Sequence, residues 1–361
     1  MRIRAGKNHQ RRAIALVMVM VVILAFGVLA ASFAFSMKVE MCLAGNTTRD
    51  PDMEWLGRSG IELASFVLVE KMQIPVEGQF DALSQMWAGG PLGTNEVLMA
   101  ISLTDVPLGE GMINVRIRDL ERKININIAD EPLLQHTMQV MGVDPFAADV
   151  IVDSILDWMD PDPNPRLNGA DGEAYLAEPN PPFPPYRAKS GPIDHISELL
   201  LIRGIEPSLY YGLGAGPGPG DGAPPDISGV GIGELGNMGL RDLFTPIGGP
   251  RVNVNTASVA VLSLIPGLGL NLARDIVQTR RGFDGLDSTE DDLPFIRIQD
   301  LGVVPGMVPE LITILNRFCT VRSSMFEVEI ETRLGDHTKT YLATLVRRGS
   351  RDVLVINFYP I

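Results

Sequence analysis

An uncharged apolar segment dominates the N-terminal part of the chain. Residues 13–37 carry no charged side chain and are flanked by Arg11-Arg12 and Lys38. At a rise of about 1.5 Å per residue, a helix of this length spans roughly 37 Å, more than the bilayer hydrocarbon core of about 30 Å. The apolar region of a cleaved signal peptide is about 7–15 residues long, which is too short to describe this segment. The pattern predicts a membrane-spanning helix over residues 14–37.

After the apolar segment, the spacing of hydrophobic residues changes twice. Asp50-Pro51 is typical of a new helix start, with Asp as the N-cap and Pro in the first turn. Apolar residues then keep one helical face through Met72. Strands are expected at residues 97–103 and at residues 113–117, where apolar and polar side chains alternate.

The C-terminal region also alternates between apolar and polar positions. Strands are expected at residues 326–334, 339–348 and 352–359, separated by Gly335-Asp336 and Gly349-Ser350 at spacings typical of β-hairpins. A long helix, strands, a helical interval and a final meander together predict an α+β fold. In this fold a large α-helical insertion interrupts one α+β domain.

The predicted insertion contains an internal repeat. Residues 123–129 (KININIA) match residues 251–257 (RVNVNTA), and residues 196–204 match residues 298–306. We therefore expect two helical units, which are residues 123–214 and 251–317, within an insertion that covers 123–317. The Gly/Pro-rich linker between them, residues 214–250, is expected to lack a core of its own.

The Asn-x-Asn element at the start of each unit is expected to end a strand and lead into a helix. Asn tolerates the backbone angles of turns, and Asn255 or Thr256 is placed to cap the helix that follows.

Charge is distributed unevenly along the chain. The formal net charge is −14, but five basic residues and no acidic residue precede Ala13, which leaves −19 for the remainder. This acidity disfavours nucleic acid as a partner, because phosphate binding requires clustered Lys and Arg. The positive-inside rule places residues 1–12 in the cytoplasm and the acidic body across the membrane.

Other sequence features limit the possible chemistry. The two cysteines, Cys42 and Cys319, are too few for a disulfide framework, and neither lies in a zinc-binding motif. Two unrelated apolar residues and a single disulfide both remain open as interpretations. No nucleophile elbow, phosphate-binding loop or dinucleotide fingerprint occurs, so the sequence does not predict an enzyme.

One acidic stretch is a candidate metal site. Five carboxylates lie in a segment that Pro161, Pro163 and Pro165 keep extended; they are Asp157, Asp160, Asp162, Asp171 and Glu173. Hard oxygen donors on a turn-rich loop suit calcium, although the spacing is not that of an EF-hand. A solvated acidic loop is the alternative interpretation. Hydrolysis by these carboxylates is the weakest hypothesis, because no basic or nucleophilic partner is suggested nearby.

A second candidate site lies in the second repeat unit. Residues 264–269 (LIPGLG), followed by Arg280-Arg281, resemble the helix-hairpin-helix modules of DNA-uptake receptors, in which backbone N–H groups of a glycine-containing hairpin contact phosphate. Asp275, Asp284 and Asp287 flank this hairpin and disfavour DNA binding. A membrane-anchored DNA receptor therefore stands as the alternative function.

The N-terminus has the form of a type IV pilin-like leader. A short basic head ends in Arg11-Arg12-Ala13, and the uncharged helix follows from Ile14. A plain single-pass anchor is the other interpretation of this segment.

In their order, several motifs resemble the K-type minor pseudopilins of type II secretion systems, the general secretion pathway protein K family. They are the uncharged leader, the Lys123-Ile-Asn-Ile-Asn turn, Asp157-Trp-Met-Asp160-Pro-Asp162 with Glu173, Ser197-Glu-Leu-Leu with Arg203-Gly204, and Val254-Asn-Thr-Ala257. The resemblance covers nearly the whole chain from Ala13 onward.

This resemblance implies a fold and a set of partners. The expected parts are a leader (1–13), the transmembrane helix (14–37), a pilin-like domain in two pieces (38–122 and 318–361) and the inserted helical domain. Assembly with the I-type and J-type minor pseudopilins and the major pseudopilin is implied, at the tip of a periplasmic pseudopilus anchored in the bacterial inner membrane. One or two bound calcium ions are also implied.

Processing is implied as well. A prepilin peptidase would cut after Ala13, and Ile14 would become a methylated N-terminus. Most pilins carry Glu at the fifth mature position, where it pairs with the terminal amine of the subunit ahead, but here that residue is Met18. A buried Glu without a partner is costly in a membrane, so its absence is expected of a capping subunit.

The chain departs from the family pattern at several points. Ala13 stands where Gly is usual, Ser190 stands where Asn is expected, and the Gly/Pro linker is unusually long. Gly45 and Pro51 interrupt the segment that the family would form as one continuous helix.

Overall fold

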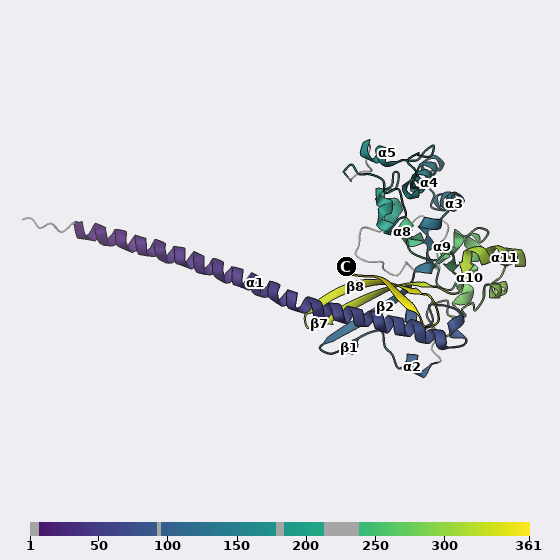
Figure 1. Cartoon of the computed structure of the whole chain (residues 1–361), viewed down its shortest axis with the longest axis horizontal. Helices are drawn as coiled ribbons and strands as arrows, with labels where there is room; N and C mark the ends of the chain where they lie inside the picture. The colour runs from purple at the N-terminus through teal and green to yellow at the C-terminus, as the bar shows by residue number, and fades with distance from the viewer. Residues whose placement is uncertain (1–6, 92–94, 178–183, 213–237) are drawn as a thin grey trace, which may run out of the picture.

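A long helix projects from a body with two parts (Figure 1). The computed structural model describes residues 7–91, 95–177, 184–212 and 238–361, with side chains described from Leu16 onward apart from residues 42–48. One part of the body is an antiparallel sheet packed on the second half of the helix. The other part is the helical insertion, which is drawn above and to the right of the sheet in Figure 1.

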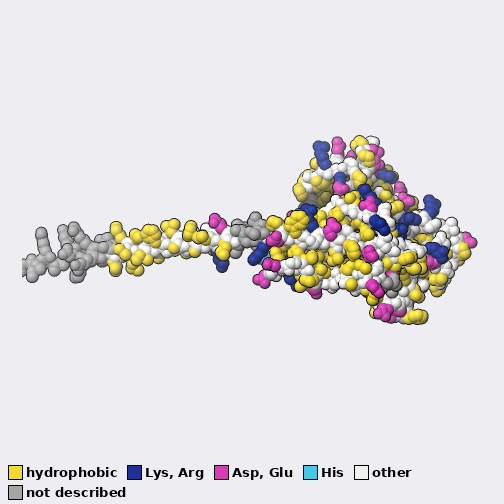
Figure 2. Space-filling view, turned by 60° about the horizontal axis from the view of Figure 1, so that its bottom comes forward, with side chains coloured by type: hydrophobic (Ala, Val, Ile, Leu, Met, Phe, Trp, Pro, Cys, Tyr) yellow, Lys and Arg dark blue, Asp and Glu magenta, His cyan; other side chains and the backbone are white. Residues whose placement is uncertain are grey.

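The long helix, α1 (Lys7–Gln73), has two halves with different surroundings. Leu16–Met41 has a mean hydropathy of 2.8 and none of it is buried, so it is long and apolar enough to cross a membrane. Figure 2 shows this half as a single projecting helix whose surface is mostly hydrophobic. From Met53 onward, α1 buries Ile61, Ala64 and Leu68 at helical spacing against the sheet.

The prediction of a new helix start at Asp50-Pro51 is wrong, because Pro51 lies inside α1. A proline within a helix removes one backbone hydrogen bond and crowds the preceding turn. The helix continues through this point because the residues after Met53 are held on the sheet by burial.

Five strands form the main sheet, in the order β1-β2-β7-β8-β9 with every neighbouring pair antiparallel. Their bounds are β1 (Val106–Leu108), β2 (Gly111–Asp119), β7 (Met325–Leu334), β8 (His337–Arg347) and β9 (Val353–Pro360). The predicted strand at 113–117 and the three C-terminal strands are confirmed. Their burial alternates as the sequence does, for example along β2 and β7.

Strand β2 pairs with β7 along its whole length, from Gly111 opposite Leu334 to Asp119 opposite Phe326. The insertion therefore leaves the sheet after Asp119 and returns just before Met325. Because both crossings lie at one end of the same strand pair, the insertion is attached to the sheet domain at a single place.

Two glycines allow α1 to approach the sheet closely. A Cβ on Gly60 would lie 2.6 Å from Ile330 Cγ2, and one on Gly57 would lie 2.9 Å from Tyr341 Cδ2. Both distances are shorter than ordinary van der Waals contact, so larger residues would push the helix away from the sheet.

The prediction of a strand at 97–103 is also wrong. Residues Glu96–Met99 form a short helix, α2, and Asn95 caps it by accepting a hydrogen bond from Val97 N at 2.8 Å. Leu98 inserts into the core of the sheet domain. Short 3₁₀ helices precede it at η1 (Glu77–Gln79) and η2 (Met86–Ala88).

The insertion consists of short helices around its own hydrophobic core. The first predicted unit contains β3 (Ile124–Asn125), η4 (Ile126–Ile128), α3 (Glu131–Val140), α4 (Pro145–Met159), α5 (Gly172–Ala177), η5 (Ile196–Leu201) and α6 (Pro207–Tyr211), preceded by η3 (Leu120–Arg122). The second contains β5 (Val252–Asn253), α9 (Val259–Ser263), α10 (Gly269–Arg280), η6 (Ile298–Val303) and α11 (Pro309–Phe318), and it is followed by β6 (Cys319–Thr320). In each unit two helices are followed further along by a 3₁₀ helix and a last helix, but the first unit also contains η4 and α5.

The predicted linker, residues 214–250, differs in its second part from the expectation. Residues 213–237 lie outside the described residues. The remainder forms α8 (Leu240–Leu243) and β4 (Phe244–Thr245), whose Leu240, Leu243 and Phe244 are buried in the core of the insertion. The expectation that this segment contributes no core is therefore wrong from Met238 onward, where Gly and Pro give way to large apolar residues.

The Asn-x-Asn elements do end strands, as predicted. Strand β3 pairs in parallel with β4, and β5 pairs in parallel with β6. The side-chain oxygen of the first Asn accepts from the N–H two residues later at 3.0 Å in both copies, Asn125 to Asn127 and Asn253 to Asn255.

The predicted cap of the following helix is wrong. Ser258, not Asn255 or Thr256, caps α9 by accepting from Val261 N. Asn255 instead bonds to the backbone N–H and C=O of Phe295, which pins a neighbouring loop.

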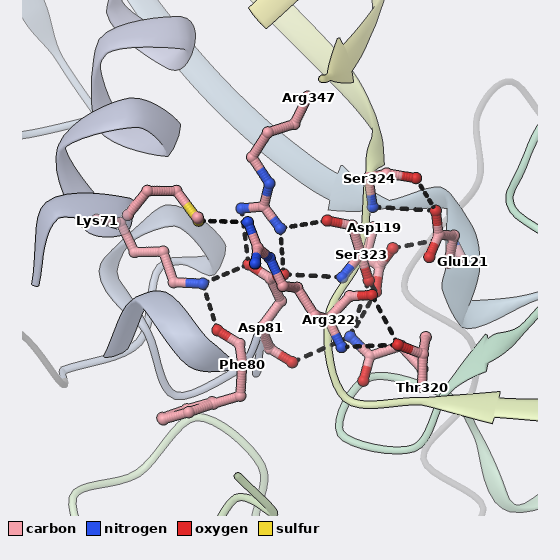
Figure 3. A network of polar contacts seen from close by, with 12 residues as sticks. Lys71, Phe80, Asp81, Asp119, Glu121, Thr320, Arg322, Ser323, Ser324 and Arg347 are labelled. Carbon is pink, nitrogen blue, oxygen red and sulfur yellow. Dashed lines mark hydrogen bonds and ion pairs between the residues drawn. The ribbon is translucent and has the colours of Figure 1, made fainter. Parts of the chain in front are cut away.

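A buried carboxylate, Asp81, ties α1 to the sheet beneath the insertion (Figure 3). Lys71 Nζ lies 2.5 Å from Asp81 Oδ1, and Arg347 contacts both carboxylate oxygens. Ser323 N, just after the insertion, donates to Asp81 Oδ2 at 2.8 Å. Burial alone would raise the pKa of Asp81, but Lys71 and Arg347 hold it below its ordinary value.

A second buried carboxylate, Asp119, ties the end of β2 to the second unit of the insertion. Its Oδ2 accepts from Thr256 Oγ1 and Ser323 Oγ, both at 2.6 Å, and from Asn253 Nδ2 at 3.1 Å. Burial raises the pKa of Asp119; its hydroxyl donors lower it only in part, and none of these partners is a cation.

A third carboxylate, Glu121, completes this junction between the two parts of the body. It accepts hydrogen bonds from Ser324 N and Oγ. Burial, together with the nearby Asp119 and Asp81 charges, raises the pKa of Glu121 to about 7 against the opposing Ser324 hydrogen bonds.

Substituting Asp81 tests the importance of the buried ion cluster. Asp81→Asn leaves Lys71 and Arg347 buried without a counter-charge, and we expect the free energy of unfolding to fall by about 3–5 kcal/mol. Urea unfolding of the full chain in detergent, followed by tryptophan fluorescence, measures this change. Asp336→Asn, at an exposed turn position, is the matched control and is expected to change stability by less than about 0.5 kcal/mol. Equal effects of the two substitutions would contradict this account.

Glu121 predicts a specific pH dependence of stability. An acid whose pKa is raised by folding, here from 4.5 to about 7, binds more protons in the folded chain than in the unfolded chain. Its contribution therefore makes stability fall as the pH rises through that interval. Glu121→Gln keeps an acceptor for Ser324 and is expected to remove roughly 2–3 kcal/mol of this fall between pH 5 and pH 8. The exposed Glu110→Gln should leave the pH profile unchanged, and an unchanged profile for both variants would refute the prediction.

Candidate functional site

The predicted acidic loop begins at the end of α4, where Asp157 is buried. Its two oxygens accept from Arg166 N at 3.2 and 3.0 Å, so the carboxylate holds the loop that follows it. Burial raises the pKa of Asp157 while the Arg166 contacts lower it, and the neighbouring Asp153 and Asp160 charges raise it further. Asp153 is a residue that the sequence reasoning missed.

Three of the other predicted ligands organise their own stretches of loop. Asp160 Oδ1 accepts from Asp162 N at 3.1 Å, Asp162 Oδ1 from Asn164 N at 2.7 Å, and Asp171 Oδ1 from Glu173 N at 3.0 Å. These are local Asx turns, which Asp side chains commonly form. The Glu173 side chain is exposed at the start of α5.

The structure brings Asp157 near Asp160 and Asp153 but does not collect all five predicted ligands into one shell. Among the residues that the structure describes, no group of three or more His, Cys, Asp or Glu side chains is arranged to hold a metal ion. A calcium shell at Asp157, Asp160, Asp162, Asp171 and Glu173 is therefore not assembled in this conformation, and calcium binding stays a prediction.

Tight packing holds the base of the acidic loop. Trp158 and Tyr175 meet edge to face with ring centroids 5.5 Å apart, and Tyr186 stacks on Tyr175 at 5.4 Å. The Tyr175 hydroxyl accepts from Arg203 N at 3.1 Å, and burial raises the pKa of Tyr175 to about 12. A Cβ on Gly169 would lie 1.9 Å from Asp157 Oδ2, so only glycine allows the loop to pass this carboxylate.

Ser190 explains one departure from the family pattern. Its φ is +50°, in the left-handed region where Asn is favoured over most residues. Position 190 thus has the left-handed backbone that favours Asn, although Ser stands there.

The glycine hairpin of the second unit has the expected backbone, but the two arginines that follow it are buried and paired. Gly267 and Gly269 have φ of +90° and +61°. Arg280 and Arg281 are buried and both contact Asp287, and Arg280 also donates to Val254 O and Ala257 O at 2.8 Å. The two arginines that suggested DNA binding therefore serve the core of the unit.

The residues predicted for processing lie in α1. Ala13 and Ile14 fall in the part of the helix whose side chains are not described, and Met18 is exposed. Cys319 is buried with a free thiol, and burial raises its pKa to about 12. The side chain of Cys42 is outside the described set, so the disulfide hypothesis stays open.

The sequence is similar to known secretion proteins. A family model described as type II secretion system protein K matches residues 113–214, and a model of the helix-hairpin-helix motif matches residues 249–320. The type II secretion system protein K of Klebsiella pneumoniae is 26% identical over 209 residues, which is 57% of this chain and 62% of that relative, slightly less than two thirds. The protein of the same name from Aeromonas hydrophila is 22% identical over 373 residues, which is 96% of each chain.

The fold is similar to that of a solved protein. A chain in the crystal structure of the GspK-GspI-GspJ complex from the type 2 secretion system of enterotoxigenic Escherichia coli aligns with a TM-score of 0.59 at 18% identity. The alignment covers 88% of this chain and 98% of the solved one. The long apolar helix, the split sheet domain with its helical insertion, and the sequence matches agree in supporting a minor pseudopilin similar to type II secretion system protein K.

Proposed function

We propose that the chain is a structural subunit at the tip of a pseudopilus, where it caps or initiates assembly for protein export across the outer membrane. Its first helix would span the inner membrane once, with the N-terminus in the cytoplasm and the acidic body in the periplasm. It would act as an assembly component and not as an enzyme.

The observation that carries this proposal is that the two halves of α1 have different surroundings. None of Leu16–Met41 is buried, while the second half of the same helix is the spine of the sheet domain. Exposed apolar surface on this scale requires lipid or similar helices around it. One continuous helix would therefore connect a membrane or filament core directly to the folded body.

The residue near the presumed mature N-terminus favours a capping position. If the chain begins at Ile14 after cleavage, its fifth residue is Met18, which has no charge to pair with an amine on a subunit ahead. A subunit at the tip has no such amine in front of it, so an apolar residue there avoids the cost of an unpaired buried carboxylate.

The expected partners follow from the solved relative. The complex in which that relative was crystallised contains GspK, GspI and GspJ. We infer that this chain assembles with its own I-type and J-type minor pseudopilins, and through them with the major pseudopilin. The shared order of elements in residues 123–214 and 251–317 supports the idea of two repeated helical units in the inserted domain.

Co-isolation from native membranes tests the function. The tagged chain is expected to bring down the I-type and J-type subunits, and intact-mass measurement is expected to find a chain that begins at a methylated Ile14. Ala13→Ile places a bulky residue before the cut and should block processing, while Ala13→Gly is the control that should preserve it. A native chain that retains residues 1–12 and isolates without other pilin-like chains would refute the proposal.

The alternative of a DNA receptor has support only from the helix-hairpin-helix match at residues 249–320. A Cβ on Gly267 would lie 2.8 Å from Leu311 Cδ1, so the hairpin glycine packs against α11. Because Arg280 and Arg281 are also buried, the residues of this motif are better explained by packing within the unit than by phosphate binding. The secretion function is therefore the one that the geometry favours.

We further propose that the acidic loop binds calcium, as one or two ions. The charges of Asp153 and Asp160 both act on Asp157 and raise its pKa, so the three carboxylates repel one another. A divalent cation would relieve this repulsion and draw in Asp162, Asp171 and Glu173 from either side of the loop. These oxygens supply the hard donors that calcium prefers.

Calcium is expected to raise the melting temperature of the full chain in detergent. For a Kd near the micromolar range, millimolar calcium would stabilise the folded state by about 4 kcal/mol. Asp162→Asn preserves the turn acceptor but removes a charge, so we expect weaker calcium binding by about tenfold. Asp52→Asn, on the exposed face of α1, is the control. Identical melting in calcium and in chelator would remove the metal from the proposal.

A further inference from the structure

A hollow beside the junction of the sheet domain and the insertion is rich in arginine. It has a volume of about 270 Å³. The charged and hydroxyl side chains that line it include Arg251, Arg322, Arg347, Arg348, Ser323 and Ser324. Arg251 belongs to the insertion, next to β5, whereas Arg322 follows β6 and Arg347-Arg348 end β8.

Among the described residues, three of these arginines form no direct ion pair, although the Asp81 charge also acts on Arg322. Arg347 is paired with Asp81, which it shares with Lys71, so one carboxylate already faces two cations. Within the described part of the chain, Arg251, Arg322 and Arg348 form no ion pair with a carboxylate. The Arg322 guanidinium has only a contact of 3.5 Å from Nη2 to the sulfur of Met72.

The positive charges lie close enough to affect one another. Figure 3 shows Arg322 beside Arg347 at the centre of the network. Partial loss of solvent around the exposed Arg322 lowers its pKa and the charge of Arg347 lowers it further, while the charge of Asp81 opposes them. In a chain of net charge −14, a local excess of cations that repel one another is an unfavourable arrangement unless an anion joins it.

The remaining groups in the wall do not provide that anion. Glu121 lines the hollow, but its carboxylate is held by Ser324 N and Oγ, and its pKa is raised to about 7. The Ser323 hydroxyl donates to Asp119. Recognition in the hollow would thus fall to the guanidinium groups, whose planar arrays of donors match the oxygens of phosphate.

We propose that this hollow binds a small oxyanion of the phosphate class through Arg251, Arg322 and Arg348, with Arg347 as the buried wall behind them. Because Arg251 comes from the insertion, Arg348 from the sheet domain and Arg322 from the segment that joins them, the bound anion bridges the two parts and holds their relative orientation.

A phosphate titration of the full chain in detergent tests the site. Inorganic phosphate, added at constant ionic strength against chloride, is expected to raise the melting temperature, and calorimetry gives its Kd. Arg251→Gln and Arg322→Gln are each expected to raise that Kd at least about tenfold, because each removes a charge-assisted contact. Arg203→Gln, at an exposed position of the insertion away from the hollow, is the control and should bind phosphate as the native chain does.

Folding and binding can be separated in this experiment. Arg251 and Arg322 are exposed and unpaired, so in chloride their variants should melt at or above the native temperature. Phosphate that stabilises no more than chloride, or equal Kd values for the native chain and both variants, overturns the proposal. A DNA duplex that binds through Arg251 and Arg322 where free phosphate does not would also overturn it.

Discussion

The buried carboxylate of Asp81 is paired with two cations, and this pairing fixes how the parts of the body meet. Its side chain is wholly inaccessible, and it draws together Lys71 from the end of α1, Arg347 from the end of β8 and the backbone of Ser323 after the insertion. Removing an ion from water costs several kcal/mol. These buried charges are therefore stable only when Asp81, Lys71 and Arg347 are in contact with one another. The end of the membrane helix, the edge of the insertion and the last hairpin are therefore held in one arrangement. The rest of the body is built around that arrangement.

The neighbouring carboxylates stabilise the same junction by a different kind of interaction. Asp81 is held ionised by two cations, whereas Asp119 is surrounded by hydroxyl and amide donors, and the two pKa values shift in opposite directions. Asn253 connects them, since its Nδ2 donates both to the backbone oxygen of Asp81 and to Asp119 Oδ2. This residue is the first Asn of the second Asn-x-Asn element. An element that ends a strand thus also joins the insertion to the sheet domain, which explains why an Asn, with its two donors and one acceptor, suits this position.

The parts of the fold that were predictable from sequence are those with a local period. Strand β2 alternates because one of its faces is buried, and β7 does the same. The continuity of α1 through Pro51 was not predictable in this way, because burial after Met53 outweighs a local break. Asp153 could have been found, since it precedes Asp157 by one helical turn in α4. Ser258 could have been found as a cap directly before an apolar run. Asp81, Lys71 and Arg347 carry no such signal, because only the tertiary fold brings them together.

The pattern of charge and exposure follows from the two environments that the chain must join. The first half of α1 is apolar on every side, so it has no preferred face and can be surrounded by lipid or by similar helices. The second half has one buried face, and glycines at positions 57 and 60 bring it so close to Ile330 and Tyr341 that it cannot rotate on the sheet. The first half of α1 therefore has no contact within the body that fixes it, whereas the second half is fixed on the sheet. Because the helix is continuous, a displacement of its membrane half would displace the whole body. The ion cluster at its far end extends this coupling to the insertion, since Lys71 lies on α1 and Asp81 is held by the same segment that leads back from the insertion to the sheet.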